Sequence, residues 1–350
     1  MKINPEIIRN IVLNEISLIV ISKKKPLSFY LFENVEDNIK IAANIGPAAV
    51  RDLVDSYDDK YELKKALHGM HDENKYDDKI HVSSTMKVRV GELVPTQNEV
   101  DLMKSIAFPL GHIDILKKVI MSNTSDAPGS LSIAGNEILD GHHRWSGVWG
   151  ICGPSGEIFV ENIDLPGENT AQKLAAAQLA IAAYKDAEQK QPAASEEIIY
   201  NILGKSKDAV FQMILDNVGK KTSRKVSGTL LNDEMLVACV NDDVVAEWAD
   251  FDLGADTDTV KFKIISRVAN NLAGDYPIPS NPNAPERIDM PQFDAASIGG
   301  KQAKKDIYVG LSAGDFNIKE PFRKDNVQIE SNKQTNNILV ERWQRLAGIK

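Results

Sequence analysis

The clearest pattern of hydrophobic and polar positions in this chain predicts a β-hairpin that runs directly into a helix. Two short apolar segments, Leu131–Ala134 and Glu137–Leu139, flank the pair Gly135-Asn136, which is a typical hairpin signal. Gly141 then ends the second strand, and the residues from His142 to Cys152 follow helical spacing. The apolar positions of this predicted helix are Trp145, Val148, Trp149 and Cys152.

The chain before this hairpin is predicted to be helical first and strand-rich afterwards. Residues 4–78 carry apolar positions at helical spacing, and Pro5 marks a helix start. Met86, Val88 and Val90 alternate with Lys, Arg and Gly, which is the period of a half-buried strand. Further predicted elements in this half are helices over residues 100–106 and 113–121 and a strand at Ile158-Phe159-Val160.

The second half of the chain is predicted to be mainly helical. After Pro166-Gly167 the sequence is rich in alanine, and residues 168–188 predict one long helix with Leu174, Leu179 and Ile181 facing inward. Additional helices are predicted over residues 195–203, 208–218, 229–248, 257–272 and 336–346, together with a short strand at Ile307-Tyr308-Val309.

Length and composition favour a globular protein with two domains, or with one domain and helical additions. The 350 residues exceed the size at which single hydrophobic cores usually stop growing. The hydrophobic content of 43% is ordinary for a globular protein. We expect a helical region over residues 1–79, a small mixed-sheet domain over 80–170 and a helical region over 171–275. The remainder, residues 276–350, would hold an extended proline-rich arm, the short strand and the terminal helix.

Charge, hydropathy and cysteine content narrow the expected cellular compartment and the expected classes of binding partner. No run reaches the roughly 18 to 20 apolar residues of a membrane span, and no secretory leader pattern is present. The only two cysteines, Cys152 and Cys239, lie far apart, so we expect a reduced, cytoplasmic setting, or a virion if the chain is phage-encoded. The net charge of -9 argues against uniform coating of nucleic acid, although one local basic patch is present. This patch comprises Lys205, Lys207, Lys220, Lys221, Arg224 and Lys225.

The junction between the hairpin and the following helix concentrates groups that bind anions. Backbone N–H groups converge at a helix N-terminus, and His142, His143 and Arg144 stand there. The fork of Arg144 can hold phosphate bidentately, or it can pair with a surface carboxylate. Only one of the two histidines is expected to face a ligand. Asp140 can hold magnesium or cap the helix.

With strand, turn and helix in place, this stretch resembles the ParB/sulfiredoxin superfamily, whose members bind nucleotides through a Gly-x-x-Arg box. Gly141-His142-His143-Arg144 matches that box. Leu93-Val94-Pro95-Thr96-Gln97 is similar to the Pro…Gln box that opens the family domain, and Leu102–Ile106 is similar to its first helix. The resemblance implies a small α+β domain that binds ATP or CTP with Mg²⁺.

The same resemblance implies roles for further residues. Asp140 to Arg144 is similar to the Asp-Gly-x-His-Arg string of the kinase and nuclease-like branches, and Glu99 corresponds by position to the kinase base. Glu99 can equally be a first-turn helix carboxylate, and Gln97 can contact a ligand or close a turn. Glu168-Asn169 begins a helix where ParB proteins carry Glu-Asn-x-x-Arg, but Gln172 stands at the arginine position.

A helix-turn-helix resembling that of ParB proteins is placed over residues 195–218. Gly204 lies in the turn and Val210 packs the second helix, while Tyr200 occupies the position of a small alanine. An ordinary helical hairpin is the alternative. If the motif binds DNA, the basic patch would contact the phosphate backbone.

Three functions follow from these observations. The first is nucleotide hydrolysis or phosphoryl transfer, in which Arg144 and His143 stabilise charge, Asp140 holds the metal and Glu99 is the base. The second is a DNA-binding, ParB-like partition or regulatory protein, or a nuclease. The third is a structural component of a viral or phage assembly, with self-association or an assembly partner. Neither a P-loop nor a Gly-x-Gly-x-x-Gly sequence occurs.

Overall fold

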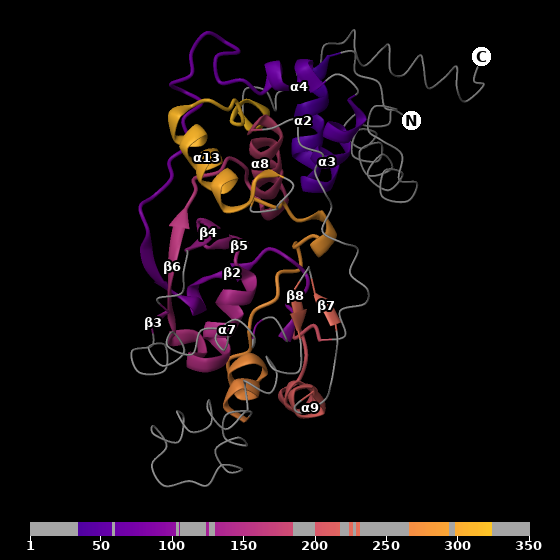
Figure 1. Cartoon of the computed structure of the whole chain (residues 1–350), viewed down its shortest axis with the longest axis vertical. Helices are drawn as coiled ribbons and strands as arrows, with labels where there is room; N and C mark the ends of the chain where they lie inside the picture. The colour runs from indigo at the N-terminus through magenta and orange to yellow at the C-terminus, as the bar shows by residue number, and fades with distance from the viewer. Residues whose placement is uncertain are drawn as a thin grey trace, which may run out of the picture.

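A computed structural model of the chain describes ten stretches of the sequence (Figure 1). They comprise residues 34–57, 60–102, 105, 124–125, 130–184, 200–217, 224–226, 229–231, 266–293 and 298–323.

The centre of the described structure is a curled mixed sheet with the strand order β1-β6-β4-β5-β2, to which β3 adds beside β6. The β4–β5 and β1–β6 pairs are antiparallel, whereas β6 runs parallel to β4 and β2 runs parallel to β5. The α+β class expected from the sequence is therefore correct. The strands are β1 (Met86–Arg89), β2 (Val94–Pro95), β3 (Thr124–Ser125), β4 (Leu131–Ala134), β5 (Glu137–Asp140) and β6 (Glu157–Asn162).

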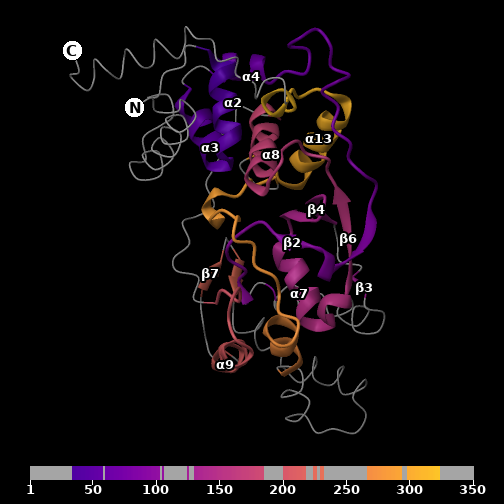
Figure 2. The same ribbon diagram turned by 180° about the vertical axis from the view of Figure 1, so that it is seen from behind.

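Helices from both ends of the chain surround this sheet (Figures 1 and 2). The α-helices are α2 (Val35–Ile45), α3 (Pro47–Ser56), α4 (Lys60–Ala66), α7 (His142–Cys152), α8 (Thr170–Tyr184), α9 (Lys207–Asn217), α13 (Gly300–Ala313) and a helix over residues 266–273. Short 3-10 turns are η2 (Val90–Glu92), η3 (Gly153–Ser155), η4 (Arg287–Asp289) and η6 (Glu320–Phe322). A separate two-stranded sheet pairs β7 (Arg224–Val226) with β8 (Thr229–Leu231).

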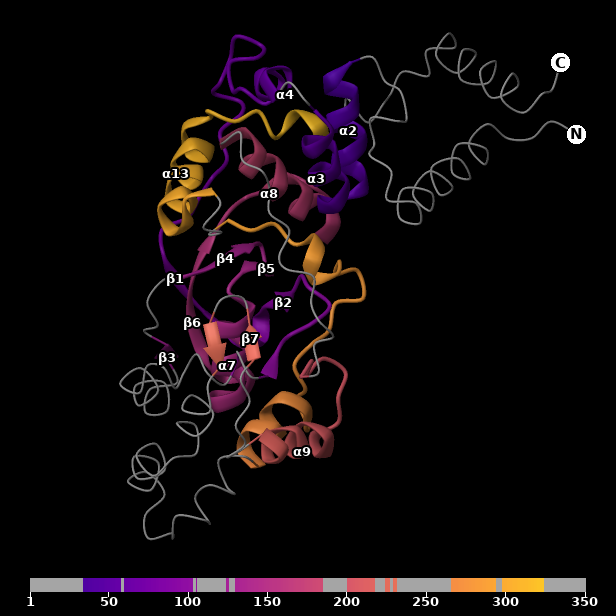
Figure 3. The same cartoon turned by 45° about the vertical axis from the view of Figure 1, so that its right-hand side comes forward.

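The sheet has one hydrophobic core on each face. Leu131, Ile133 and Ile138 pack against α7, α9 and the helix over 266–273, whereas Ala134 and Leu139 pack against α2, α3, α8 and α13. Successive side chains of a strand point to opposite faces, so the hairpin contributes to both cores at once. Figure 3 shows α8 and α13 at one end of the molecule and α7 and α9 at the other, with the sheet between them.

Several predicted elements are confirmed with bounds close to the expected ones. The β4–β5 hairpin turns at Gly135, where φ is 69°, and α7 begins at His142. Residues 168–188 contain α8, with Leu174, Leu179 and Ile181 buried. The strands around residues 88 and 158 pair with each other as β1 and β6.

The predicted strand at Ile307-Tyr308-Val309 is wrong, because these residues lie inside helix α13. Three β-favouring residues in a row predicted a strand. The buried positions Ala303, Ile307 and Leu311 instead recur every four residues, so tertiary burial of a helical face decides the structure.

Two predicted helices are wrong where they can be compared with the structure. Residues 200–203 are not helical, since Asn201 forms an isolated bridge with Asp101. The helix predicted from Thr229 begins instead as strand β8, which pairs with β7. The helices predicted over residues 113–121 and 336–346 lie outside the described residues, as do residues 1–33.

The proline-rich segment over residues 277–285 is extended, as predicted, but it packs on the protein instead of forming an arm. Ile278 is buried, and the Asn281 amide donates to Thr170 Oγ1 at 3.3 Å. Just beyond it, the buried Arg51 of α3 donates to Asp289 Oδ1 at 2.7 Å. The segment and the residues just after it therefore pack against α8 and α3.

Two smaller features bear on the setting of the protein. Among the described residues, no helix combines the length and the apolar character needed to cross a bilayer. Cys152 lies at the end of α7, and burial raises the pKa of its thiol to about 11. A thiol with so high a pKa is a poor nucleophile.

Residue-specific truncation tests the helical assignment of α13. Ile307 is fully buried, whereas Val309 is 68% exposed. We expect Ile307→Ala to lower the free energy of unfolding by roughly 2 to 5 kcal/mol and Val309→Ala to change it by less than about 0.5 kcal/mol. Urea denaturation of both variants measures this. A strand would place both residues on one face, so equal losses would contradict the helix.

Candidate functional site

The Asp140–Arg144 turn is shaped by a glycine that no other residue can replace without strain. Gly141 lies between β5 and α7 in the left-handed region, with φ at 100°. A Cβ atom at this position would stand 2.4 Å from Leu131 Cδ2 and 3.0 Å from Arg144 Nη2. The turn is therefore tight, and the Arg144 side chain folds back over it.

Two cations converge on the carboxylate of Asp140. Lys304 Nζ, from α13, donates to Asp140 Oδ2 at 2.7 Å, and Arg144 Nη2 lies 3.7 Å from the same oxygen. Burial alone would raise the pKa of Asp140, but Lys304 and then Arg144 outweigh it and hold the pKa below its usual value. Asp140 is therefore ionised, and the three side chains together carry one net positive charge.

Lys304 is a site residue that the sequence reasoning missed. It lies 164 positions from Asp140 and on a helix that was predicted as a strand, so no local signal linked the two. One turn further along α13, the hydroxyl of Tyr308 hydrogen-bonds the Ser132 hydroxyl of β4. Burial raises the pKa of Tyr308 above its ordinary value, so its hydroxyl stays protonated.

The two histidines at the start of α7 differ in their surroundings, as the sequence predicted. His142 is buried, and its Nε2 accepts a hydrogen bond from the backbone N–H of Thr96 at 3.0 Å. Burial lowers the pKa of His142 to about 3, and the neighbouring Arg287 adds to this effect. His142 is thus a neutral structural residue. His143 is only half-buried and is the one that a ligand could reach.

The loop that carries Gln97 and Glu99 lies against this turn. Thr96 anchors it, because its hydroxyl donates to the Ile138 carbonyl of β5. The Gln97 side chain donates to the Glu99 carbonyl at 2.7 Å, which is the turn-closing role considered from the sequence. Glu99 Oε1 lies 4.0 Å from Arg287 Nε, so a second carboxylate and a third cation stand near His142.

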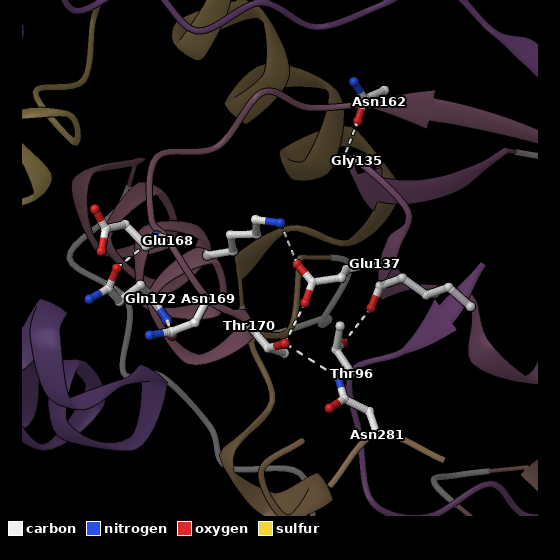
Figure 4. A network of polar contacts seen from close by, with 11 residues as sticks. Thr96, Gly135, Glu137, Asn162, Glu168, Asn169, Thr170, Gln172 and Asn281 are labelled. Atoms are coloured by element: carbon white, nitrogen blue, oxygen red, sulfur yellow. Dashed lines mark hydrogen bonds and ion pairs between the residues drawn. The ribbon is translucent and has the colours of Figure 1, made fainter. Parts of the chain in front are cut away.

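A second polar network lies at the start of α8, beside the turn between β4 and β5 (Figure 4). Lys173 Nζ contacts Glu137 Oε2 at 2.6 Å, and the Thr170 hydroxyl hydrogen-bonds the other oxygen of Glu137. This network ties α8 to the hairpin.

The Glu168-Asn169 box in this network is helix-capping chemistry. Asn169 Oδ1 accepts from the Gln172 N–H at 3.0 Å, and Gln172 Oε1 accepts from the Glu168 N–H at 2.8 Å. This reciprocal pair is a variant of the capping box, in which a glutamine serves well and an arginine could not accept a hydrogen bond. The capping role accounts for Gln172 at the position where the ParB box has arginine.

The second half of the predicted helix-turn-helix is present, whereas residues 195–199 of its first helix lie outside the described residues. Gly204, with φ at 70°, forms a turn before α9, and Val210 of α9 is fully buried. The six residues of the basic patch lie in different parts of the chain. Lys205 and Lys207 are exposed beside the start of α9, Arg224 and Lys225 lie on β7, and Lys220 and Lys221 lie outside the described residues. DNA binding by this region stays a prediction.

Comparison of the chain with protein-family models, with curated proteins and with solved structures finds no match. The ParB/sulfiredoxin resemblance therefore stays a prediction, and the site is interpreted from its own geometry.

The buried His142 predicts a pH-dependent stability. The unfolded chain protonates this histidine near pH 6.5, the ordinary value, whereas the folded chain does so only near pH 3. Above pH 6.5, neutral His142 makes its full contribution to the free energy of unfolding. Below pH 6.5, this contribution falls by about 1.4 kcal/mol per pH unit. In His142→Gln, which keeps an acceptor for Thr96, this loss should be smaller by about 2 kcal/mol between pH 7 and 5. Urea denaturation at both pH values measures it, and parallel losses in the two proteins would refute the assignment.

Proposed function

We propose that this chain is a nucleotide-binding protein that holds a phosphate group at the Asp140–Arg144 turn. The observation that carries the proposal is the convergence of Arg144 and Lys304 on one carboxylate at the start of a helix. One cation would neutralise Asp140, and the second leaves an excess of one positive charge. The amide end of α7 adds roughly half a positive charge to it.

The accessibility of these groups supports a ligand role. The side chains of Lys304 and Arg144 are 13% and 17% exposed, and that of Asp140 is 26% exposed. The cations are thus held in position while part of each stays within reach of a solute. Charge-assisted bonds from a guanidinium and an ammonium to phosphate oxygens are stronger than neutral hydrogen bonds. His143, which precedes Arg144 and is half-buried, is the proposed third contact.

Asp140 fits the role of a positioning residue better than that of a magnesium ligand. Its Oδ2 atom is already contacted by two cations, and the turn is net positive, which disfavours a free divalent ion. A triphosphate with its own Mg²⁺ would still be attracted through the phosphate oxygens. In phosphoryl transfer or hydrolysis, positioning and electrostatic stabilisation by Arg144 and Lys304 would supply most of the catalysis. Glu99, whose Oε1 lies 4.0 Å from Arg287 Nε, is the proposed base.

Charge removal at the turn tests the proposal. We expect Arg144→Gln and Lys304→Met each to weaken binding of ATP or CTP by about tenfold to a hundredfold, the usual worth of a charged hydrogen bond. Lys305→Met is the matched control, because Lys305 is an exposed neighbour on the same helix. Equilibrium dialysis with labelled ATP and CTP measures affinity, and phosphate release in the same samples reports hydrolysis. No binding by the wild-type chain, or equal binding by all four proteins, would leave only a structural ion network.

Replacement of Asp140 separates the two roles considered for it. Asp140→Asn removes the carboxylate that competes with phosphate for Arg144 and Lys304. If Asp140 only positions these cations, nucleotide affinity should stay within about tenfold of the wild type or rise, with and without Mg²⁺. If Asp140 is a magnesium ligand, affinity should fall only when Mg²⁺ is present. Dialysis in EDTA and in MgCl₂ distinguishes the two results, and thermal unfolding of the variant checks that it is folded.

A further inference from the structure

A second cluster of charged groups lies far from the turn in sequence, in the loop that follows α4 (the purple loop beside α4 in Figure 1). Asp72, Asp77 and Asp78 each place one carboxylate oxygen so that the three atoms lie within 4.8 Å of one another. Asp72 is exposed, Asp77 is half-buried and Asp78 is only 1% exposed. The cluster therefore extends from the surface into the protein.

Two oxygen atoms at the buried end of this cluster have no partner among the residues that the structure describes. Asp78 Oδ2 and Asp77 Oδ1 are both buried, and neither accepts a hydrogen bond from a described residue. Buried charges are almost always paired, hydrogen-bonded or bound to a metal ion. Burial, followed by the charges of Asp77 and Asp72, raises the pKa of Asp78 to about 6. These two buried oxygens are thus suited to a positively charged ligand.

The cations already present near the cluster hold Asp77 in place and leave the remaining charge uncompensated. Arg323 Nη2 donates to Asp77 Oδ2 at 2.7 Å, and Arg323 Nη1 lies 3.7 Å from Glu320 Oε2. Lys319 Nζ donates to the Asp77 backbone carbonyl at 2.9 Å. Because Arg323 occupies Oδ2, it is the other oxygen of Asp77 that is available. Asp72, Asp77, Asp78 and Glu320 carry four negative charges, and Arg323 and Lys319 carry two positive ones. The two negative charges that remain are what one divalent ion would neutralise.

We propose that Asp72, Asp77 and Asp78 bind a calcium ion. All three donors are carboxylate oxygens, which hard divalent cations prefer, and neither cysteine nor histidine belongs to the cluster. Ca²⁺ accepts irregular coordination by six to eight oxygens, whereas Mg²⁺ requires a near-ideal octahedron. The cluster lies on a loop of turns outside regular structure and is open to water at Asp72, which suits calcium.

Calcium at this position would stabilise the contact between the loop after α4 and the segment after α13. The loop is joined to the segment after α13 by the Gly69 N–H, which donates to the Asp315 carbonyl at 3.1 Å, and by the Lys75–Asp315 pair at 3.6 Å. Arg323 and Lys319 come from the same segment. Ordering of the three carboxylates would therefore fix the α4 loop against the chain after α13.

Calcium titration of the full-length chain tests this site. The protein is stripped with EDTA, dialysed and titrated with CaCl₂ and, separately, with MgCl₂ by calorimetry, and its melting temperature is measured with and without each ion. We expect saturable binding of a single Ca²⁺ per chain, weaker binding of Mg²⁺, and a rise in melting temperature with Ca²⁺. An unchanged melting temperature and no heat of binding, or tighter binding of Mg²⁺, would overturn the calcium site.

Matched variants separate a metal site from a structural one. Asp78→Asn should weaken Ca²⁺ binding by at least about tenfold and abolish the shift in melting temperature. In EDTA it should melt no lower than the wild type, because it removes a crowded charge. Glu73→Gln loses the same charge from an exposed position of the same loop and should bind Ca²⁺ normally. If Asp78→Asn does not fold, the exposed Asp72→Asn takes its place with the same expected loss. Calcium binding unchanged in these aspartate variants, or lost equally in Glu73→Gln, would refute the assignment.

Discussion

The β4–β5 hairpin has to bury both of its faces, and the rest of the fold depends on this constraint. Ile133 and Ile138 face one core, and Ala134 and Leu139 face the other. A sheet with two apolar faces needs a helical layer on each side. One layer comes from α7, which directly follows the hairpin. The other is assembled from α2 and α3 before it and from α8 and α13 after it. Segments from the whole chain therefore meet at a hairpin of ten residues.

The charged turn is a consequence of the same arrangement. Asp140 is the last residue of the hairpin and stands where the two helical layers meet. Burial of a carboxylate is costly unless cations compensate for it. Each layer supplies one cation, since Arg144 belongs to α7 and Lys304 belongs to α13. Because both cations contact the same carboxylate, this ion network also couples the two layers of the protein.

The sequence predicted those features that depend on residues close together in the chain. The hairpin and α7 were predicted within one residue, because alternation and helical spacing are local patterns. Gly141 and Arg144 were identified for the same reason. The inward direction of His142 was not assigned, since it depends on the amide of Thr96, in the loop that follows β2. Lys304 was missed because its helix contains three β-favouring residues in a row, and only burial in a distant core reveals their helical face.

At the Asp140–Arg144 turn, residues that the fold requires can be distinguished from residues that a ligand would require. Gly141 is required by its positive φ and by the contact with Leu131, whether or not a ligand binds. Arg144 is required to neutralise Asp140, which is again a structural need. Neither residue alone therefore argues for phosphate. Lys304 is different, because a carboxylate that Arg144 already compensates has no need of a second cation at 2.7 Å. The surplus positive charge, still partly open to water beside a helix N-terminus, is the property on which the proposed anionic ligand rests.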